Sequence, residues 1–178
     1  RYQGATFLTD NSVQGTATTR GQVLMYEKII CDARYSKSCG GMMESFATAW
    51  GGAEVPYLQV KPDSFTSDAE VDLKNPAVFA DWVSQPPNAF CSPKVIPETE
   101  LVQYLGGVDE EGAYFRWRIE ILEKDLVERL NKHTRLQISE VIDLVPESRG
   151  GSGRLSLLRV IYRDQDHQER MHRITSEY

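Results

Sequence analysis

The chain has 178 residues, of which 40% are hydrophobic and 26% charged, and its net charge is −6. A domain of this size buries roughly 70% of the surface of its unfolded chain, so the composition supports a real core and excludes disordered and fibrous classes. The basic residues are dispersed rather than clustered, which argues against a nucleic-acid partner. No run of 18 apolar residues occurs, so we expect no membrane-spanning segment.

The chain begins at Arg1, and no basic segment followed by an apolar run precedes its first polar turn. We therefore interpret it as a piece of a longer or processed protein. Residues 1–178 are expected to form a single domain. A division into two lobes is expected near residues 61–76, where a low-propensity acidic stretch is typical of a surface loop.

The first elements in chain order are a polar helix and a hairpin. Residues 10–19 predict a short helix capped by Asp10. The β-prone runs 22–27 and 29–36 are separated only by Lys28, which predicts a tight hairpin. In the second run we expect the side that carries Ile29, Cys31, Ala33 and Tyr35 to face the core.

Two helices and a strand are predicted next. Apolar residues at helical spacing predict a core-facing helix over residues 77–85, which ends before Pro86. Strict alternation over residues 114–121 predicts the strongest strand of the chain, with one side exposed to water. Residues 123–133 predict a second amphipathic helix.

Strands dominate the C-terminal part. Residues 137–145 and 154–163 predict two strands joined by a Gly-rich turn, and Asp164 begins a hairpin into residues 169–175. Strands, a helix and further strands favour an α+β fold with mixed or antiparallel sheets and a few short helices.

Three cysteines raise the question of metal, disulfide or nucleophile chemistry: Cys31, Cys39 and Cys91. No C-x-x-C or H-x-x-x-H spacing occurs, so we predict no metal site within this chain. Cys39 precedes Gly40 and Gly41, whose amides could polarise a carbonyl, but a thiol nucleophile needs a histidine. The candidates are His133, His167 and His172, which lie where solvated histidines are common.

Glu44 is the acidic residue in this Gly-rich, mostly uncharged context. Such a carboxyl group could donate a proton to a glycosidic oxygen, although a solvated side chain after a turn is the alternative. The segment "RGGSGR", residues 149–154, lacks the G-K-[ST] ending and is followed by a predicted strand. It is therefore expected to be a turn rather than a phosphate-binding loop.

Several motifs occur in a characteristic order: "ATTRGQVLMYEKIICDARYSKSCGGMMESF", "WGGAEVPYLQVKPD", "YFRWRIEI" and "RGGSGRLSLLRV". In this order they resemble the stage II sporulation protein D (SpoIID) family, which includes LytB-type amidase enhancers, over residues 2 to about 161. The resemblance is greatest to variants common in Gram-negative gut bacteria. It implies a lytic transglycosylase-like domain that acts on peptidoglycan glycan strands, with a non-catalytic wall-binding or amidase-regulating module as the alternative.

The resemblance also implies the site. Substrate-binding positions carried over from the family are Tyr2, Tyr35, Ser36, Ser38, Cys39, Gly40, Gly41 and Glu44. The family's general acid lies in a P-x-E-M motif upstream, which this chain does not contain, so the catalytic residue is unknown and the chain alone is expected to be inactive. Lys37 and Met43 stand where Ser and Thr are usual.

Further expectations follow from the same resemblance. No cofactor is expected within this chain, while zinc is allowed in a longer parent protein. Peptidoglycan glycan strands, and a cell-wall amidase, are the expected partners, and the protein is expected to be exported to the periplasm or the extracellular space. In that oxidising setting Cys31 and Cys91 are expected to pair, with Cys39 free at the groove.

Overall fold

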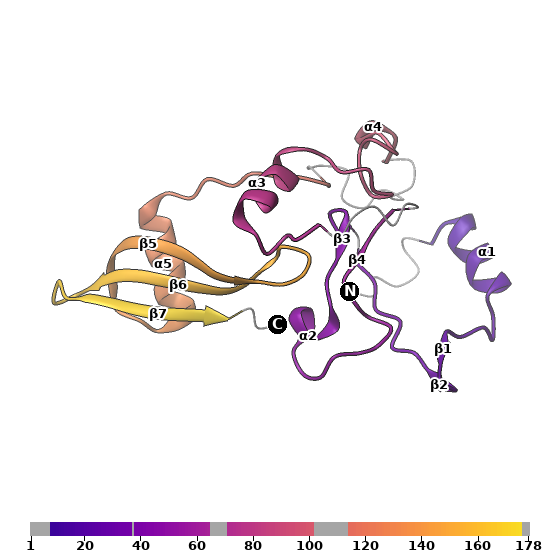
Figure 1. Cartoon of the computed structure of the whole chain (residues 1–178), viewed down its shortest axis with the longest axis horizontal. Coiled ribbons are helices and arrows are strands. Elements are labelled where there is room, and N and C mark those ends of the chain that lie inside the picture. Colours follow the sequence, from indigo (N-terminus) through magenta and orange to yellow (C-terminus); the bar gives the residue numbers. More distant parts are fainter. Residues whose placement is uncertain (1–7, 37, 65–70, 102–113, 176–178) are drawn as a thin grey trace.

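A three-stranded antiparallel sheet and one helix form the most regular part of the protein. In the computed structural model, β5 (Ile138–Arg149), β6 (Leu155–Asp164) and β7 (Glu169–Thr175) pair in the order β5-β6-β7. Helix α5 (Glu123–Thr134) lies against this sheet (Figure 1). The structure describes residues 8–36, 38–64, 71–101 and 114–175. The predicted helix over 123–133 and the three C-terminal strands are confirmed.

The core of this unit lies between α5 and the sheet. Ile138 and Val160 are 1% and 0% exposed, and Val127 and Leu130 of α5 pack against them. Asn131 fixes the helix to the first strand, since its amide group donates to the Ile138 carbonyl at 2.9 Å and accepts from the Ile138 N–H at 2.8 Å. Local periodicity and this pair of hydrogen bonds therefore position the sheet.

Strand β5 is longer than expected and continues through Pro146 to Arg149. Proline cannot donate to a strand ladder, but β5 is at an edge of the sheet, where one side of the strand has no ladder to complete. The register shifts between Pro146 and Ser148. The Gly-rich turn after β5 lies toward the middle of the molecule (Figure 1).

The middle of the chain forms a smaller unit of short elements: β3 (Met42–Met43), α2 (Phe46–Trp50), β4 (Lys61–Pro62), α3 (Pro76–Ser84) and α4 (Glu98–Leu101). Strands β3 and β4 are antiparallel. The predicted helix over 77–85 is confirmed as α3, and the Asn75 side chain caps it by accepting from the N–H groups of Ala77 and Val78. Its apolar side chains are at most half-buried and Val83 is 44% exposed, so the expectation that this helix faces the core is wrong.

The stretch 61–76 is not wholly a surface loop. It contains β4, and Leu73 is only 1% exposed, because the chain returns to pack against the α3 region and the Gly-rich turn. Residues 65–70 lie outside the described residues.

The N-terminal elements lie at the opposite end of the molecule from the β5-β6-β7 sheet (Figure 1). Helix α1 (Asp10–Thr18) confirms the predicted helix, but Thr9 rather than Asp10 is its cap, in a reciprocal pair of bonds with Ser12. All described residues of α1 are exposed. The helix is therefore stabilised by its own bonds rather than by packing.

The predicted hairpin exists, but it is much shorter than expected. Strands β1 (Met25–Tyr26) and β2 (Ile29–Ile30) pair across a turn in which Glu27 and Lys28 have φ values of 47° and 68°. The expectation that the side with Tyr35 faces the core is wrong, since Ile29 and Tyr35 are 71% and 93% exposed and Ala33 is also exposed. No third strand covers this side among the described residues, so alternation alone did not create a core.

The expected strand over residues 114–121 is also wrong. The segment is irregular and extended, with Phe115 buried but Trp117 and Ile119 each 70% exposed. A strand requires a neighbour for its N–H and C=O groups, and none of the described strands pairs with this segment. The fold as a whole is α+β, with short helices and small antiparallel sheets, and none of its described helices has the length and hydropathy needed to cross a bilayer.

Candidate functional site

The site is built around the segment of residues 38–44, called here the Gly-Gly loop. Gly40 and Gly41 have φ values of 67° and 95°, in the left-handed region that favours glycine. A Cβ atom on Gly41 would lie 2.7 Å from Cγ of Pro87 and 3.0 Å from Cζ2 of Trp82. Only a residue without a side chain fits at this position, so the loop packs closely against Pro87 and Trp82.

The Gly-rich turn, residues 149–154, packs against the Gly-Gly loop. The N–H and hydroxyl of Ser152 donate to Oε2 of Glu44 at 3.1 and 2.6 Å, and the Ser45 N–H donates to Oε1 at 2.9 Å. The Glu44 carboxylate also fills the space that a Cβ on Gly150 would need. The predicted turn is confirmed, and Glu44 is a half-buried acceptor rather than a loose solvated side chain.

Arg154 extends this link between the two segments. Its guanidinium donates to the carbonyls of Met42 and Cys39 at 3.2 and 2.8 Å and to the Ser152 hydroxyl at 2.8 Å. From another direction, Arg116 donates to the Gly40 carbonyl at 3.0 Å. Two arginines therefore satisfy carbonyl groups of a loop that has little regular secondary structure.

A cavity of about 540 Å³ lies beside the Gly-Gly loop. Five of the predicted site residues line it: Tyr35, Ser36, Ser38, Cys39 and Glu44. Gly40 lines a smaller hollow of about 300 Å³, while Gly41 is buried under Pro87 and Trp82. Tyr2 and Lys37 lie outside the described residues. The structure thus gathers most of the predicted set at one place, although the glycines support the wall rather than form it.

Aromatic side chains form another part of the wall, and the motifs predicted Tyr35 among them but not Trp50 or Tyr57. Tyr35, Trp50 and Tyr57 line the cavity and are 93%, 51% and 38% exposed. The Arg34 guanidinium lies 4.4 Å from the Trp50 ring centre and is held by Asp32 at 2.7 Å. The sequence signal for Trp50 and Tyr57 is their placement on either side of Gly51-Gly52.

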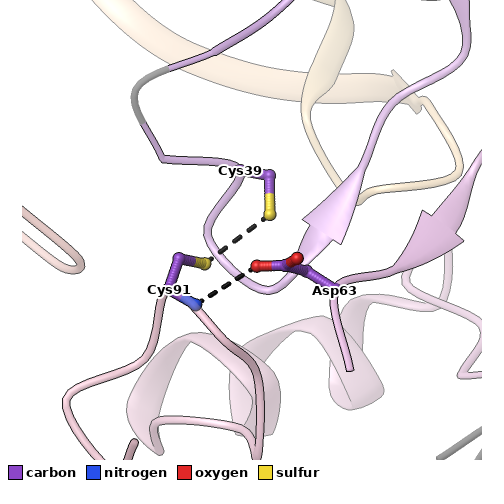
Figure 2. Close-up of side chains that lie close together, drawn as sticks. All are labelled: Cys39, Asp63 and Cys91. Atoms are coloured by element: carbon purple, nitrogen blue, oxygen red, sulfur yellow. Dashed lines mark hydrogen bonds between the residues drawn. The ribbon is translucent and has the colours of Figure 1, made fainter. Parts of the chain in front are cut away.

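A cluster of two thiols and one carboxylate lies at the cavity wall (Figure 2). The Sγ atoms of Cys39 and Cys91 are 3.6 Å apart, and the Asp63 carboxylate accepts from the Cys91 N–H at 3.2 Å. One ligand atom from each of the three residues lies within 4.8 Å of the others. Sequence spacing could not reveal this set because its members are 24 and 28 positions apart.

The cluster bears on two expectations about the cysteines. The structure places Cys39, and not Cys31, beside Cys91, so the expected pairing of Cys31 with Cys91 is wrong for this arrangement. Burial is the main factor that raises the pKa of the Cys39 thiol to about 12. None of the described hydrogen bonds joins Cys39 to a histidine. Both facts argue against a Cys39 nucleophile.

Comparison with known proteins adds one positive finding. The profile of a family described as "Domain of unknown function (DUF8618)" matches residues 44–176. The chain belongs to this family. Its matched region begins at Glu44 and includes Asp63, Cys91 and the Gly-rich turn, whereas Cys39, Gly40 and Gly41 precede it. No curated protein and no solved structure matches the chain.

Proposed function

We propose that this chain forms one wall of a groove that binds the glycan strands of peptidoglycan, within a lytic transglycosylase-like protein. The observation that carries the proposal is the cavity beside the Gly-Gly loop. It gathers Tyr35, Ser36, Ser38 and Glu44 with the exposed rings of Trp50 and Tyr57. Aromatic faces suit the apolar faces of sugar rings, while hydroxyl and carboxylate groups suit sugar hydroxyls.

The groove wall is rigid enough to position a sugar. Glu44 and Arg154 tie the Gly-Gly loop to the Gly-rich turn through several hydrogen bonds, so the loop does not have to be ordered when a ligand binds.

The proposed reaction needs one carboxyl group. This group protonates the glycosidic oxygen and then takes the proton of the muramoyl 6-hydroxyl as that oxygen closes on the anomeric carbon. Glu44 already accepts three hydrogen bonds from Ser45 and Ser152, so we assign it to positioning the wall rather than to proton donation. The acid is expected from the P-x-E-M motif of a longer parent, and export to the periplasm or the extracellular space accompanies this function.

The first test is binding by the chain as it stands. We expect it to bind denuded glycan strands in a calorimetric titration, and Trp50→Ala to weaken binding at least about 10-fold, corresponding to about 1.4 kcal/mol. Trp117→Ala is the matched control, because Trp117 is 70% exposed but does not line this cavity. Absence of binding, or an equal loss in both variants, contradicts the proposal.

A second test separates catalysis from binding alone. A longer parent that carries the P-x-E-M glutamate should release 1,6-anhydromuramoyl products from denuded glycan. A parent that binds the strands but releases no such product, with or without added metal ions, supports a non-catalytic wall-binding or amidase-regulating module instead. The hydrogen bonds that Ser152 donates to Glu44 favour this second function, because they give the carboxylate a structural role instead of proton donation.

A further inference from the structure

We infer that Cys39, Asp63 and Cys91 form a binding site for a divalent zinc ion, with a fourth coordination position open to the cavity. The inference does not depend on glycan binding, and it concerns donors that lie far apart in the sequence. Two thiolates and one carboxylate are a ligand set that suits Zn²⁺, whereas Ca²⁺ and Mg²⁺ prefer oxygen ligands alone.

The spacing of the two sulfur atoms matches metal ligands better than a disulfide. Zn–S bonds of about 2.3 Å at a tetrahedral angle place two sulfur atoms about 3.8 Å apart. A disulfide requires a separation of about 2.05 Å. The observed Sγ–Sγ distance between Cys39 and Cys91 is 3.6 Å, and a ligand atom of Asp63 lies within 4.8 Å of both.

The three donors are held in place by the backbone around them. The Asp63 N–H donates to the Gly41 carbonyl at 3.1 Å, and the Phe90 N–H donates to the Asp63 carbonyl at 2.8 Å. The Cys91 N–H donates to one oxygen of the Asp63 carboxylate, which orients this side chain toward the sulfur atoms (Figure 2). Such outer bonds to a ligating carboxylate are common in metal sites.

Two arginines near the cluster offset the negative charge that the site carries once an ion is bound. Two thiolates, one carboxylate and Zn²⁺ leave a net charge of about −1. Arg116 is close enough to interact electrostatically with both Cys39 and Cys91, and Arg154 donates to the Cys39 carbonyl. On binding, each thiol gives its proton to the buffer as a Zn–S bond forms, so no oxidant or reductant is needed.

The open position distinguishes this site from a closed structural one. Three protein ligands leave a tetrahedral ion with one position for water or a ligand. All three donor residues line the cavity of about 540 Å³, so that position is open to a molecule in the cavity. Closed structural sites instead use four protein ligands.

The test uses the fully reduced chain under anaerobic conditions. We expect one equivalent of Zn²⁺ to bind, and Co²⁺ to give a thiolate-to-cobalt charge-transfer band. Cys39→Ser, Cys91→Ser and Asp63→Asn should each lower the affinity at least about 100-fold, since even outer-shell partners are worth 10- to 100-fold. Cys31→Ser is the matched control, because Cys31 is also half-buried but lies outside the cluster.

A measurement on the unaltered chain tests the zinc site even if the variants fail to fold. Zn²⁺ should protect Cys39 and Cys91 from alkylation by N-ethylmaleimide, as read by peptide mass spectrometry, while Cys31 stays reactive to the same extent with and without the ion. Failure of the reduced chain to bind Zn²⁺ rules the site out. Equal protection of all three cysteines, or unchanged affinity in the Cys39→Ser/Cys91→Ser double variant, shows that the ion binds elsewhere and also rules it out.

Discussion

The Oε2 atom of Glu44 accepts two hydrogen bonds from Ser152, a residue 108 positions later in the sequence. Through this contact the Gly-Gly loop and the Gly-rich turn form one unit beside the cavity. Because the link involves a carboxylate, its bonds are stronger than those between neutral groups. The stability of the site wall should therefore depend on residues that are remote from each other in the chain.

Ser152→Ala should lower the free energy of unfolding by about 1.5–3 kcal/mol, the usual range for hydrogen bonds to a charged group. The reason is that the half-buried Glu44 carboxylate loses its 2.6 Å hydroxyl donor. Urea denaturation followed by circular dichroism measures the change. Ser156→Ala removes a hydroxyl that bonds Ser148 in an exposed pair, and its effect should stay within about 0.5 kcal/mol. Equal effects of the two changes would mean that the link contributes little.

Gly41→Ala should destabilise the protein by about 2–4 kcal/mol, because overpacking and a left-handed backbone both cost free energy there. The new Cβ would lie 2.7 Å from the Pro87 ring and 3.0 Å from Trp82. Gly21→Ala is the control, since Gly21 also has a positive φ, of 78°, but has no heavy atom within 4 Å of its Cβ position. The difference between the two melting temperatures isolates the contribution of crowding, and a difference near zero would contradict close packing under the loop.

Arg154→Lys should lower the free energy of unfolding by about 1–2 kcal/mol, although the charge is kept. A single ammonium group cannot reach the Cys39 carbonyl, the Met42 carbonyl and the Ser152 hydroxyl as the planar guanidinium does. Chemical denaturation gives the magnitude. Arg118→Lys, at a side chain that is 86% exposed, should change stability by less than about 0.5 kcal/mol. If Lys at position 154 is equally harmless, the bridging geometry is not important.

Acid should weaken the β5-β6-β7 sheet through Glu147. Hydrogen bonding from Arg173 is the main cause that lowers the pKa of this carboxyl below its ordinary value of 4.5, and Arg159 adds to the effect. Since the folded-state pKa is the lower one, the contribution to stability is present above the ordinary value and is lost as pH falls through the lowered value. Glu147→Gln should therefore reduce the loss of stability on acidification.

The measurement is a set of urea unfolding curves between neutral pH and pH values well below the ordinary pKa of a carboxyl group. Glu128→Gln serves as the control, because Glu128 is exposed on α5 and no ion pair involves it among the described residues. This control should keep the acid dependence of the unchanged protein. A Glu147→Gln profile that falls as steeply as the control would show that the cross-strand bridge does not contribute.

Sequence patterns were most informative where an element is stabilised by its own neighbours. Helix α5 and the β6–β7 hairpin follow from spacing that is visible within a dozen residues. Residues 114–121 have the strongest alternation in the chain, yet they do not form a strand, because alternation does not supply a partner for the backbone. The same limit explains the short β1–β2 hairpin and its exposed Ile29.

The sequence by itself determined the α+β class, the main helices and the C-terminal strands, since these depend on local preference. Only the tertiary structure brought Glu44 to Ser152 and placed Asp63 and Cys91 beside Cys39. Those contacts depend on how separate segments pack and exchange hydrogen bonds over long sequence distances. Spacing along the chain carries no information about such distances, and for this reason the donor cluster became visible only in three dimensions.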